Sequence, residues 1–347
     1  MEMDSKDKGI YMKVGKVSEA VLKRSVIKQI KTKRAEVISG AGAYEDCAAI
    51  ELKEDEVFVL STDPVTGSIH DIGRLSINTI SNDIAACGAE AVGVMLSILL
   101  PKDFEEGDLK EMMRELEAAC QELNIQIMGG HTEVTGAVNQ PIVTVTGVGR
   151  IKKDRLILVS GARLEDDIVV TKWIGLEGTS IIVNEKRALL EKKFQAPFIK
   201  KAAEFNRYLS VAGEAMLAAD FGVHAMHDVT EGGIFGALWQ MAEASRVGLN
   251  VDLKSIPIKQ ETIEICECFG LNPYELISGG AMLIATERGH DLCRVLMENG
   301  IEATVVGKFT AGNDRIITNG DEIRYLEPPK SDEIYKLYCK QKESRVK

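Results

Sequence analysis

The spacing of apolar positions in the first part of the chain predicts the helices and strands of one mixed domain. Apolar residues that recur every three or four positions predict amphipathic helices from about residue 18, over 71–87 and over 109–123. Apolar or β-branched runs predict strands at 47–52, 57–60, 91–100, 125–128 and 142–148. The charged turn at 53–56 predicts that the first two strands pair as a hairpin. This pattern is typical of an α+β domain, with a mixed or antiparallel sheet covered by helices.

A change in composition near residue 155 predicts a boundary between two domains. We expect an N-terminal domain at 1–155, a C-terminal domain at 156–330 and a polar tail at 331–347. In the C-terminal part, strands and helices are predicted to alternate at 168–171, 212–219, 223–226, 227–244 and onward through residue 284. A glycine-broken turn is expected at 175–178. This order favours an α/β domain.

The composition of the chain excludes several classes of partner and location. The 347 residues carry a formal charge of -11, which argues against a nucleic-acid partner held by phosphate attraction. No apolar run approaches the ~20 residues that span a bilayer, and the polar N-terminus lacks the apolar core of a signal peptide. The seven cysteines are an odd number and mostly occupy apolar patterns. We therefore expect reduced thiols and a cytoplasmic protein without membrane contact.

Acidic residues beside small residues at the ends of predicted elements are the candidates for chemistry. They are Asp46, Asp63, Asp83, Glu133 and Asp228. The strand at 57–60 is expected to end at Ser61-Thr62-Asp63-Pro64 and so to present Asp63. A single Asp at such a place is more often a cap or a turn former. Together the acids suit Mg²⁺, which binds carboxylates and substrate phosphates, and glycine pairs would let backbone N–H groups approach those phosphates.

Other signatures of nucleotide or metal chemistry do not fit the chain. The stretch 9–16 has the wrong spacing for a P-loop, and the glycine pairs at 40–42 and 147–149 lack the third glycine of a dinucleotide fingerprint. His224-x-x-His227 and Cys266-x-Cys268 lack obvious further ligands, so we favour a structural role for both. A Rossmann or Walker-type site is therefore not expected.

Several short motifs nevertheless resemble one family when they are taken in order. They are Glu45-Asp46-Cys47-Ala48-Ala49, Ser61-Thr62-Asp63, Asn82-Asp83-Ile84-Ala85-Ala86-Cys87-Gly88-Ala89, Gly129-Gly130-His131-Thr132 and His227-Asp228-Val229-Thr230-Glu231-Gly232-Gly233. The same order is found in the aminoimidazole ribonucleotide synthetase (PurM-like) superfamily, and the resemblance runs from about residue 15 to 317. It implies a two-domain α/β fold in which the N-terminal sheets of two subunits form a barrel at a homodimer interface.

The resemblance also implies the ligands and the residues that bind them. ATP and Mg²⁺ would lie in a cleft beside the barrel, and the γ-phosphoryl group would pass to an oxygen of an acceptor with release of ADP. The metal ligands would be Asp46, Asp63, Asp83 and Asp228. The nucleotide contacts would come from these acids and from Thr62, Asn82, Gly129, Gly130, His131 and Thr132. For His131, a phosphate contact and a solvated loop position are equally favoured.

The acceptor stays open. The stretch 71–75 resembles HypE-type hydrogenase maturation factors, which end in a Pro-Arg-Ile-Cys tail whose cysteine carries the substrate. Here Cys339 precedes the final Lys347 by eight residues, so carbamoyl dehydration on a terminal thiol is not expected. A selenophosphate synthetase would have a reactive cysteine near its N-terminus, whereas the first cysteine here is Cys47. The acceptor could be a small molecule or be borne by a protein. A kinase like thiamine-monophosphate kinase and a non-catalytic nucleotide-binding assembly or regulatory subunit are the alternatives.

Overall fold

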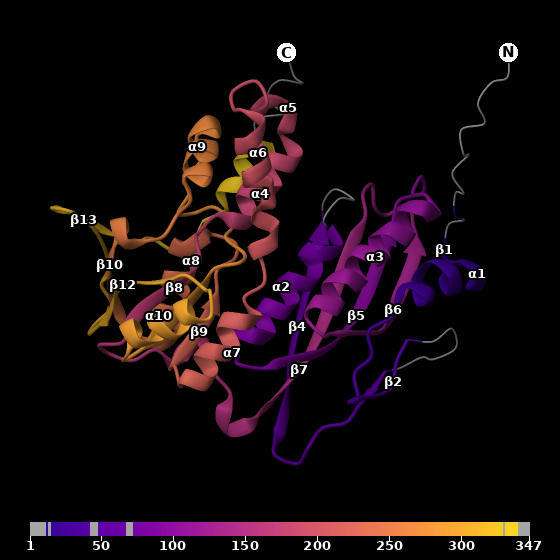
Figure 1. Ribbon diagram of the computed structural model, residues 1–347, viewed down its shortest axis with the longest axis horizontal. Helices are drawn as coiled ribbons and strands as arrows, with labels where there is room; N and C mark the ends of the chain where they lie inside the picture. Colours follow the sequence, from indigo (N-terminus) through magenta and orange to yellow (C-terminus); the bar gives the residue numbers. More distant parts are fainter. Residues whose placement is uncertain (1–11, 13–14, 42–47, 67–71, 329, 339–347) are drawn as a thin grey trace. The chain divides into compact units, whose positions relative to one another are not determined.

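The chain folds into two compact units, each with its own sheet (Figure 1). The computed structural model describes residues 12, 15–41, 48–66, 72–328 and 330–338. Unit 1 comprises Met1–Ile84 with Ala89–Asp154, and unit 2 comprises Ala85–Gly88 with Arg155–Lys347. None of the helices in the described ranges combines the length and apolarity that crossing a bilayer requires.

Unit 1 is built on a mixed sheet with the strand order β1-β6-β5-β7-β4. Its strands are β1 (Gly15–Lys16), β4 (Glu56–Thr66), β5 (Glu90–Leu100), β6 (Gln126–Val134) and β7 (Ile142–Lys152). A separate pair is formed by β2 (Val37–Ser39) and β3 (Ala49–Ile50). Strands β5 and β6 run parallel and the other neighbours in the large sheet run antiparallel. The predicted mixed sheet is therefore confirmed.

The helices of unit 1 follow the predicted apolar spacing. They are α1 (Glu19–Val21), continued by a π-helical turn (Leu22–Val26) and a 3₁₀ turn (Ile27–Gln29), α2 (Ile72–Ala86) and α3 (Glu106–Glu122). Leu109, Met112 and Leu116 repeat along one face of α3 and are fully buried. The helix ends at Glu122 with Leu123 as its cap, and Asn124 follows with a positive φ of 54°, a left-handed conformation that asparagine tolerates and that ends a helix.

Two predictions about the strand that carries Asp63 are wrong. It forms no hairpin with 47–52, because β3 pairs with β2 while β4 pairs along its whole length with β7. Nor does it end at the polar tetrapeptide, since β4 continues through Asp63 and Pro64 to Thr66. The proline is tolerated because β4 is an edge strand, where one side of the backbone needs no hydrogen-bonding partner.

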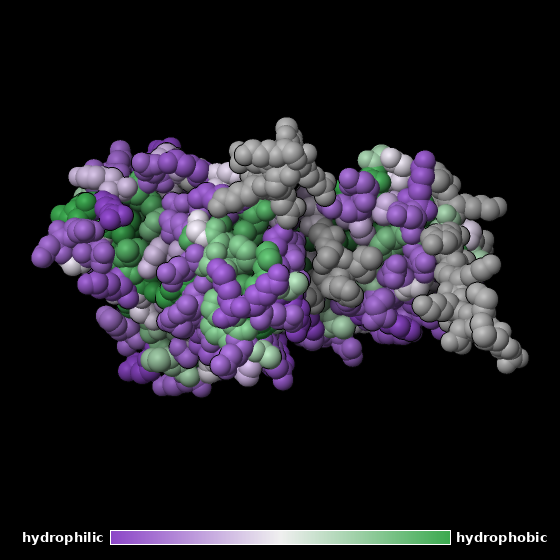
Figure 2. Space-filling view, turned by 90° about the horizontal axis from the view of Figure 1, so that it is seen from above, coloured by the Kyte–Doolittle hydropathy of each residue, from purple (hydrophilic) through white to green (hydrophobic). Residues whose placement is uncertain are grey.

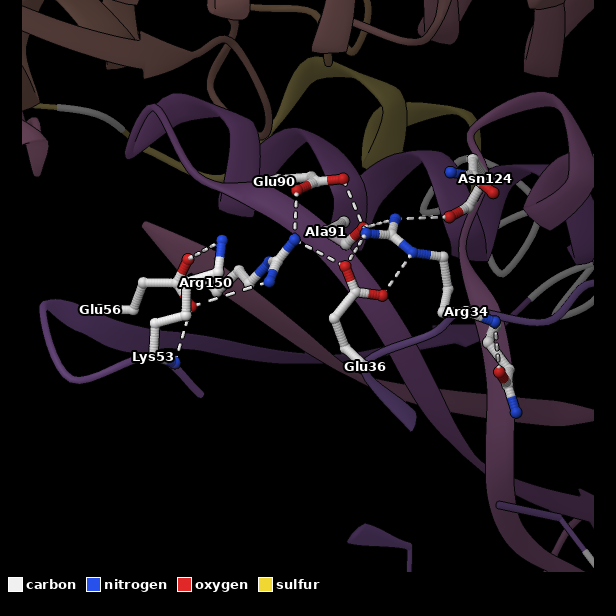
Figure 3. Close-up of polar contacts among 9 residues, drawn as sticks. Arg34, Glu36, Lys53, Glu56, Glu90, Ala91, Asn124 and Arg150 are labelled. Atoms are coloured by element: carbon white, nitrogen blue, oxygen red, sulfur yellow. Dashed lines mark hydrogen bonds and ion pairs between the residues drawn. The ribbon is translucent and has the colours of Figure 1, made fainter. Parts of the chain in front are cut away.

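A network of arginines and glutamates ties the segment before β2 to the sheet (Figure 3). The Arg34 guanidinium donates to Glu36 at 2.9 Å and to Glu90 at 2.7 Å, and Arg150 reaches Glu36 at 2.6 Å. Arg34 also donates to the backbone carbonyl of Asn124 at 2.9 Å. Its side chain is only 7% exposed. The network therefore holds a buried cation with several charge-assisted hydrogen bonds.

Unit 2 contains a second mixed sheet with helices on both faces. In the order β14-β13-β10-β12-β8-β11-β9, its strands are β8 (Asp167–Thr171), β9 (Ala225–Asp228), β10 (Gly248–Asp252), β11 (Met282–Thr286), β12 (Ala303–Thr310), β13 (Arg315–Asn319) and β14 (Glu322–Tyr325). The helices are α4 (Leu176–Glu185), α5 (Arg187–Leu190), α6 (Ala196–Ala203), α7 (Ala212–Phe221), α8 (Gly233–Ser245), α9 (Gln260–Phe269) and α10 (Gly289–Glu298). Short 3₁₀ turns lie at Lys153–Arg155, Val159–Gly161, Glu204–Tyr208, Leu253–Ser255 and Glu333–Tyr335.

The sheet of unit 2 carries an apolar layer on each of its two sides, and a third apolar cluster lies among α4, α6 and α9. Val170 of β8 packs in the layer that contains Leu238 of α8, whereas Val169 packs with Ala215 of α7 and Leu292 of α10. Strands β8 and β11 are buried along their full length, as expected for central strands of an α/β layer structure. On the outside, Figure 2 shows mostly hydrophilic surface interrupted by smaller apolar patches.

The predicted turn at 175–178 is wrong beyond its first residue. Gly175 has a left-handed backbone with φ 70°, but Leu176–Gly178 already form the first turn of α4. The glycines predict a break in the chain there. Instead they allow close packing, because a Cβ at Gly178 would lie 2.5 Å from the Cγ of Leu276.

Candidate functional site

The register of the unit 1 sheet places Asp63 and Gly130, the second residue of the Gly129-Gly130 pair, in one row across the strands. Asp63 of β4 pairs with Val145 of β7, Val145 pairs with Leu96 of β5, and Leu96 pairs with Gly130 of β6. Three inter-strand spacings separate the ends of this row, roughly 14 Å in all. Residues 67 positions apart in sequence are therefore aligned across the sheet by strand pairing.

Alternation along the strands divides the predicted nucleotide contacts between two faces of this sheet. Thr62 and His131 lie on the open face, where Thr62 shares a hydrogen bond of 2.9 Å with Thr146 and the His131 Nε2 lies 3.0 Å from Glu133. Thr132 points to the opposite, helix-covered face and is 5% exposed. The contiguous motif at 129–132 therefore does not form one surface.

Asp83 is brought to β4 by the close packing of α2 on the sheet. The Ser61 hydroxyl donates to the Asp83 carboxylate at 2.5 Å. This approach is possible because Gly147 lies under the helix, where a Cβ would be 2.2 Å from the Ile80 Cγ2. Asp63 shares the helix-covered face of β4 with Ser61. The neighbouring Asn82 is 3% exposed.

The glycine pair Gly129-Gly130, which is predicted to contact the nucleotide, lies within strand β6. Gly130 has φ 145°, and a Cβ there would be 1.9 Å from the Leu96 carbonyl oxygen. Glycine is therefore required by the contact between β5 and β6, where the register also shifts. A contact of these backbone N–H groups with a nucleotide stays a prediction. Asp46, the fourth predicted metal ligand, lies outside the described residues.

In unit 2 the two strands that flank β11 end beside a glycine pair. Strands β8 and β9 each run antiparallel to β11. Their carboxyl ends, at Thr171 and Asp228, therefore lie at the same end of the sheet, where β11 begins. Gly279 and Gly280 precede β11 at this end. The Thr171 hydroxyl accepts a hydrogen bond from the Met282 N–H at 3.0 Å.

Asp228 carries a buried oxygen without a partner. Asp228 is 5% exposed, and its Oδ2 has no hydrogen-bond partner among the described residues. The other oxygen lies 3.7 Å from the His227 Nδ1. A buried carboxylate oxygen left without a donor fits a site for a hard cation such as Mg²⁺. Across the described parts of the chain, no three His, Cys, Asp or Glu side chains group as a ready metal site.

Glu177 stands in the same region and was not predicted. It is 7% exposed, and its carboxylate accepts a hydrogen bond from the Gly279 N–H at 3.0 Å. Burial raises the pKa of Glu177 to about 7, and the charges of Asp332, Asp228 and Glu231 contribute to that rise. The only signal in the sequence was an acid directly beside a glycine in a segment taken for a turn.

Lys172, which follows β8, is fully engaged in holding the fold. Its ammonium donates to the carbonyls of Tyr208 at 3.0 Å and Ser210 at 2.6 Å, and it pairs with the Glu214 carboxylate at 2.7 Å. An ammonium has three donors, so these contacts leave none for a ligand. Burial lowers the pKa of Lys172, against the effect of Glu214.

The histidine pair and the cysteine pair have structural contacts. The His224 Nδ1 lies 2.8 Å from Asp166 and its Nε2 lies 2.9 Å from the Arg163 guanidinium. The His227 Nε2 contacts the Gln240 side chain at 2.8 Å. Cys266 is buried in α9, and burial raises the pKa of its thiol to about 12.

Comparisons with known proteins identify relatives over most of the chain. The model of the AIR synthase related protein N-terminal domain matches residues 44–151, and that of the C-terminal domain matches residues 163–319. A hydrogenase expression/formation protein of Methanocaldococcus jannaschii is 26% identical, over 87% of this chain and 90% of the relative. The carbamoyl dehydratase HypE of Cupriavidus necator is 30% identical, over 72% of this chain and 74% of the relative.

Solved structures with the same fold include HypE and a kinase. HypE in complex with ATP superposes with a TM-score of 0.78 at 20% identity, covering 92% of this chain and 97% of HypE. HypE in a HypE–HypF complex has a TM-score of 0.68 at 19% identity, covering 78% and 90% of the two chains. Thiamine-monophosphate kinase from Stenotrophomonas maltophilia has a TM-score of 0.69 at 20% identity, covering 84% and 93%. These likenesses confirm the predicted two-domain PurM-like fold. The chain belongs to the AIR synthase-related family, and its relatives within that family include the HypE proteins.

Proposed function

We propose that the protein is an ATP- and Mg²⁺-dependent enzyme that transfers a phosphoryl group to an oxygen of an acceptor and releases ADP. The observation that carries the proposal is the buried, unpartnered Oδ2 of Asp228, in a chain whose relatives are ATP-using enzymes. The described carboxylates proposed to bind Mg²⁺ are Asp63 and Asp83 in unit 1 and Asp228 in unit 2. Asp46 is proposed on its motif alone.

In such a reaction the protein positions its substrates and neutralises charge. Bound Mg²⁺ would neutralise charge that develops on the phosphate oxygens. Ser61 holds the Asp83 carboxylate in place by its hydrogen bond of 2.5 Å, so this ligand is oriented before the cation binds. The buried position of Asp228 limits its hydration, which strengthens its attraction for a cation.

The proposal is tested by calorimetry with Mg²⁺ and a non-hydrolysable ATP analogue. The wild type should bind the analogue, and Asp63→Asn should abolish that binding. Asp55→Asn, in the exposed turn before β4, is the matched control and should bind normally. Absence of binding by the wild type, together with no ADP release across carboxamides, thiamine monophosphate and purine intermediates, would refute the proposal.

A thiamine-monophosphate-kinase-like activity is the second candidate, favoured by the structural likeness to that kinase. It predicts ADP release that depends on thiamine monophosphate. HypE is known in a complex with HypF, which favours a protein-borne acceptor as the other possibility. Analogue binding without turnover on any acceptor would instead support a nucleotide-binding assembly or regulatory subunit.

We further propose that the open face of the unit 1 sheet is the surface through which two copies associate. On β4, Phe58 and Leu60 share this face and are 44% and 65% exposed. Neighbouring large apolar side chains on an open sheet favour a protein partner. Leu60→Lys should convert a dimer to a monomer in sedimentation velocity, whereas Leu189→Lys, at a similarly exposed leucine of α5, should not. A wild type that sediments as a monomer would contradict the proposal.

A further inference from the structure

Three carboxylates of unit 2 surround the charge of a fourth, Glu177. Asp332, Asp228 and Glu231 all act electrostatically on Glu177. They come from separate elements, because Glu177 is in the first turn of α4, Asp228 ends β9, Glu231 precedes α8 and Asp332 caps the last 3₁₀ turn. Such a group needs donors or cations to balance its charge.

Two of the four carboxylates, Asp332 and Glu231, are held by donors near α8 and the last 3₁₀ turn. Asp332 accepts hydrogen bonds from the Gly232 N–H at 2.7 Å and the Ile334 N–H at 2.9 Å. Glu231 accepts a hydrogen bond of 2.5 Å from the Tyr335 hydroxyl. These hydrogen bonds therefore stabilise the negative charges of Asp332 and Glu231 within the fold.

The other two carboxylates lack balancing charge. Among the described residues, the Asp228 Oδ2 is buried without a hydrogen-bond partner, and Glu177 accepts a hydrogen bond from the neutral N–H of Gly279. In the part of the chain that the structure describes, neither forms an ion pair with Lys or Arg. A divalent cation beside these two groups would supply the positive charge that the described residues do not.

The Glu177 carboxylate and the backbone at Asp228 are both anchored on the same short stretch of chain. Glu177 is held by Gly279, while Asp228 pairs with Met282 and the following Val229 N–H donates to the Ala281 carbonyl at 3.0 Å. Only two residues, 280 and 281, separate the two anchoring points, Gly279 and Met282. Gly279 admits the Glu177 carboxylate because it has no side chain, since a Cβ would lie 2.2 Å from the Oε2.

We propose that Glu177 joins Asp228 in holding a divalent cation, with Mg²⁺ as the natural ion and water or phosphate oxygens completing its shell. Two carboxylates neutralise one divalent cation, and Mg²⁺ is commonly held by one or two carboxylates with other oxygens. The inference rests on the proposed function for the role of Asp228 and adds Glu177, a residue outside the family motifs. Because both ligands belong to unit 2, the cation binds without nucleotide.

The test uses the full-length protein, without nucleotide, and Mn²⁺ as a probe that electron paramagnetic resonance detects. Glu177→Gln and Asp228→Asn should each weaken one Mn²⁺ site at least tenfold. Glu231→Gln is the matched control, since it removes an acid of the same region that already has a donor, and its Mn²⁺ affinity should stay within threefold of wild type. Circular dichroism establishes that each variant is folded.

A variant with a shorter acidic side chain at position 177 distinguishes direct binding of the cation from a general electrostatic effect of the negative charge. Glu177→Asp keeps the charge and moves the carboxylate, so it should also weaken Mn²⁺ binding if Glu177 is a ligand. Unchanged affinity in Glu177→Gln, or equal weakening in Glu231→Gln, would overturn the inference. Mn²⁺ binding that depends on Glu177 in a chain that binds no ATP analogue would keep the inference and refute the proposed function. If the chain binds the ATP analogue but Glu177→Gln leaves the Mn²⁺ affinity unchanged, the proposed function is kept and the inference about Glu177 is refuted.

Discussion

Removing the charge of Glu36 should loosen the β2–β3 pair by a predictable amount. The Arg34 guanidinium, which donates to both oxygens of Glu36, lowers the pKa of that carboxyl from 4.5 to about 2 (Figure 3). A difference of that size corresponds to ~3 kcal/mol at neutral pH. Solvent reaches the network, because the Glu90 side chain is 47% exposed. We therefore expect Glu36→Gln to cost about 2 kcal/mol, or roughly 30-fold in the local opening equilibrium.

The sign of the pH dependence follows from the lowered pKa. Stability from the Glu36 carboxylate is fully present above pH 4.5 and is lost as the pH falls toward about 2. The difference between wild type and Glu36→Gln should therefore be largest at pH 7 and smaller by roughly a third or more at pH 3.5.

Hydrogen exchange measures this opening directly. The Glu51 N–H donates to the Glu36 carbonyl at 2.9 Å, so its exchange rate reports on the segment. Each variant is compared with wild type at the same pH, by mass spectrometry of peptides that contain residue 51. Glu54→Gln, in the exposed turn before β4, should exchange like wild type. A Glu36→Gln effect below threefold at pH 7, or one of equal size at both pH values, would refute the reasoning.

Three further outcomes are expected. Lys172→Met leaves the buried carboxylate of Glu214 without its cation and should lower the free energy of unfolding of unit 2 by ~3 to 5 kcal/mol. Urea denaturation followed by tryptophan fluorescence measures this change, and an unchanged denaturation midpoint would contradict it. Gly130→Ala should destabilise unit 1 by ~2 to 4 kcal/mol in thermal circular dichroism, whereas Gly107→Ala, where a Cβ meets nothing within 4 Å, should not. Cys266, whose pKa is raised to about 12 by burial, should be alkylated far more slowly than the partly exposed Cys268, as seen by peptide mass spectrometry.

The helices of unit 1 could be predicted because their signals are local. The apolar face of α3 repeats within the helix itself, and Asn124 stops it through its own backbone preference. Strand pairing is not local in this way. The turn at 53–56 suggested a hairpin, but β4 pairs with β7, whose first residue lies 76 positions beyond the last residue of β4. Nothing within either strand specifies that register.

The same difference between local and long-range signals explains which residues of the candidate site could be predicted. Asp63, Asp83 and Asp228 could be proposed because each stands in a motif of small and polar residues. Glu177 could not, because its place depends on burial and on the N–H of Gly279, which is 102 residues away. The sequence also does not predict the two faces of the 129–132 segment, because the predicted strand ends at residue 128. Strand β6 continues to Val134, and alternation along it turns His131 and Thr132 in opposite directions.

The tight contact between Gly279 and the Glu177 carboxylate has an evolutionary consequence. With only 2.2 Å available between a Cβ at 279 and the Oε2 of Glu177, the two positions cannot change independently. Relatives that carry a side chain at the first position should have a shorter residue at the second, and relatives that keep the acid should keep the glycine. Co-variation of this pair across the family would thus mark which of its members retain an acid at this end of the sheet.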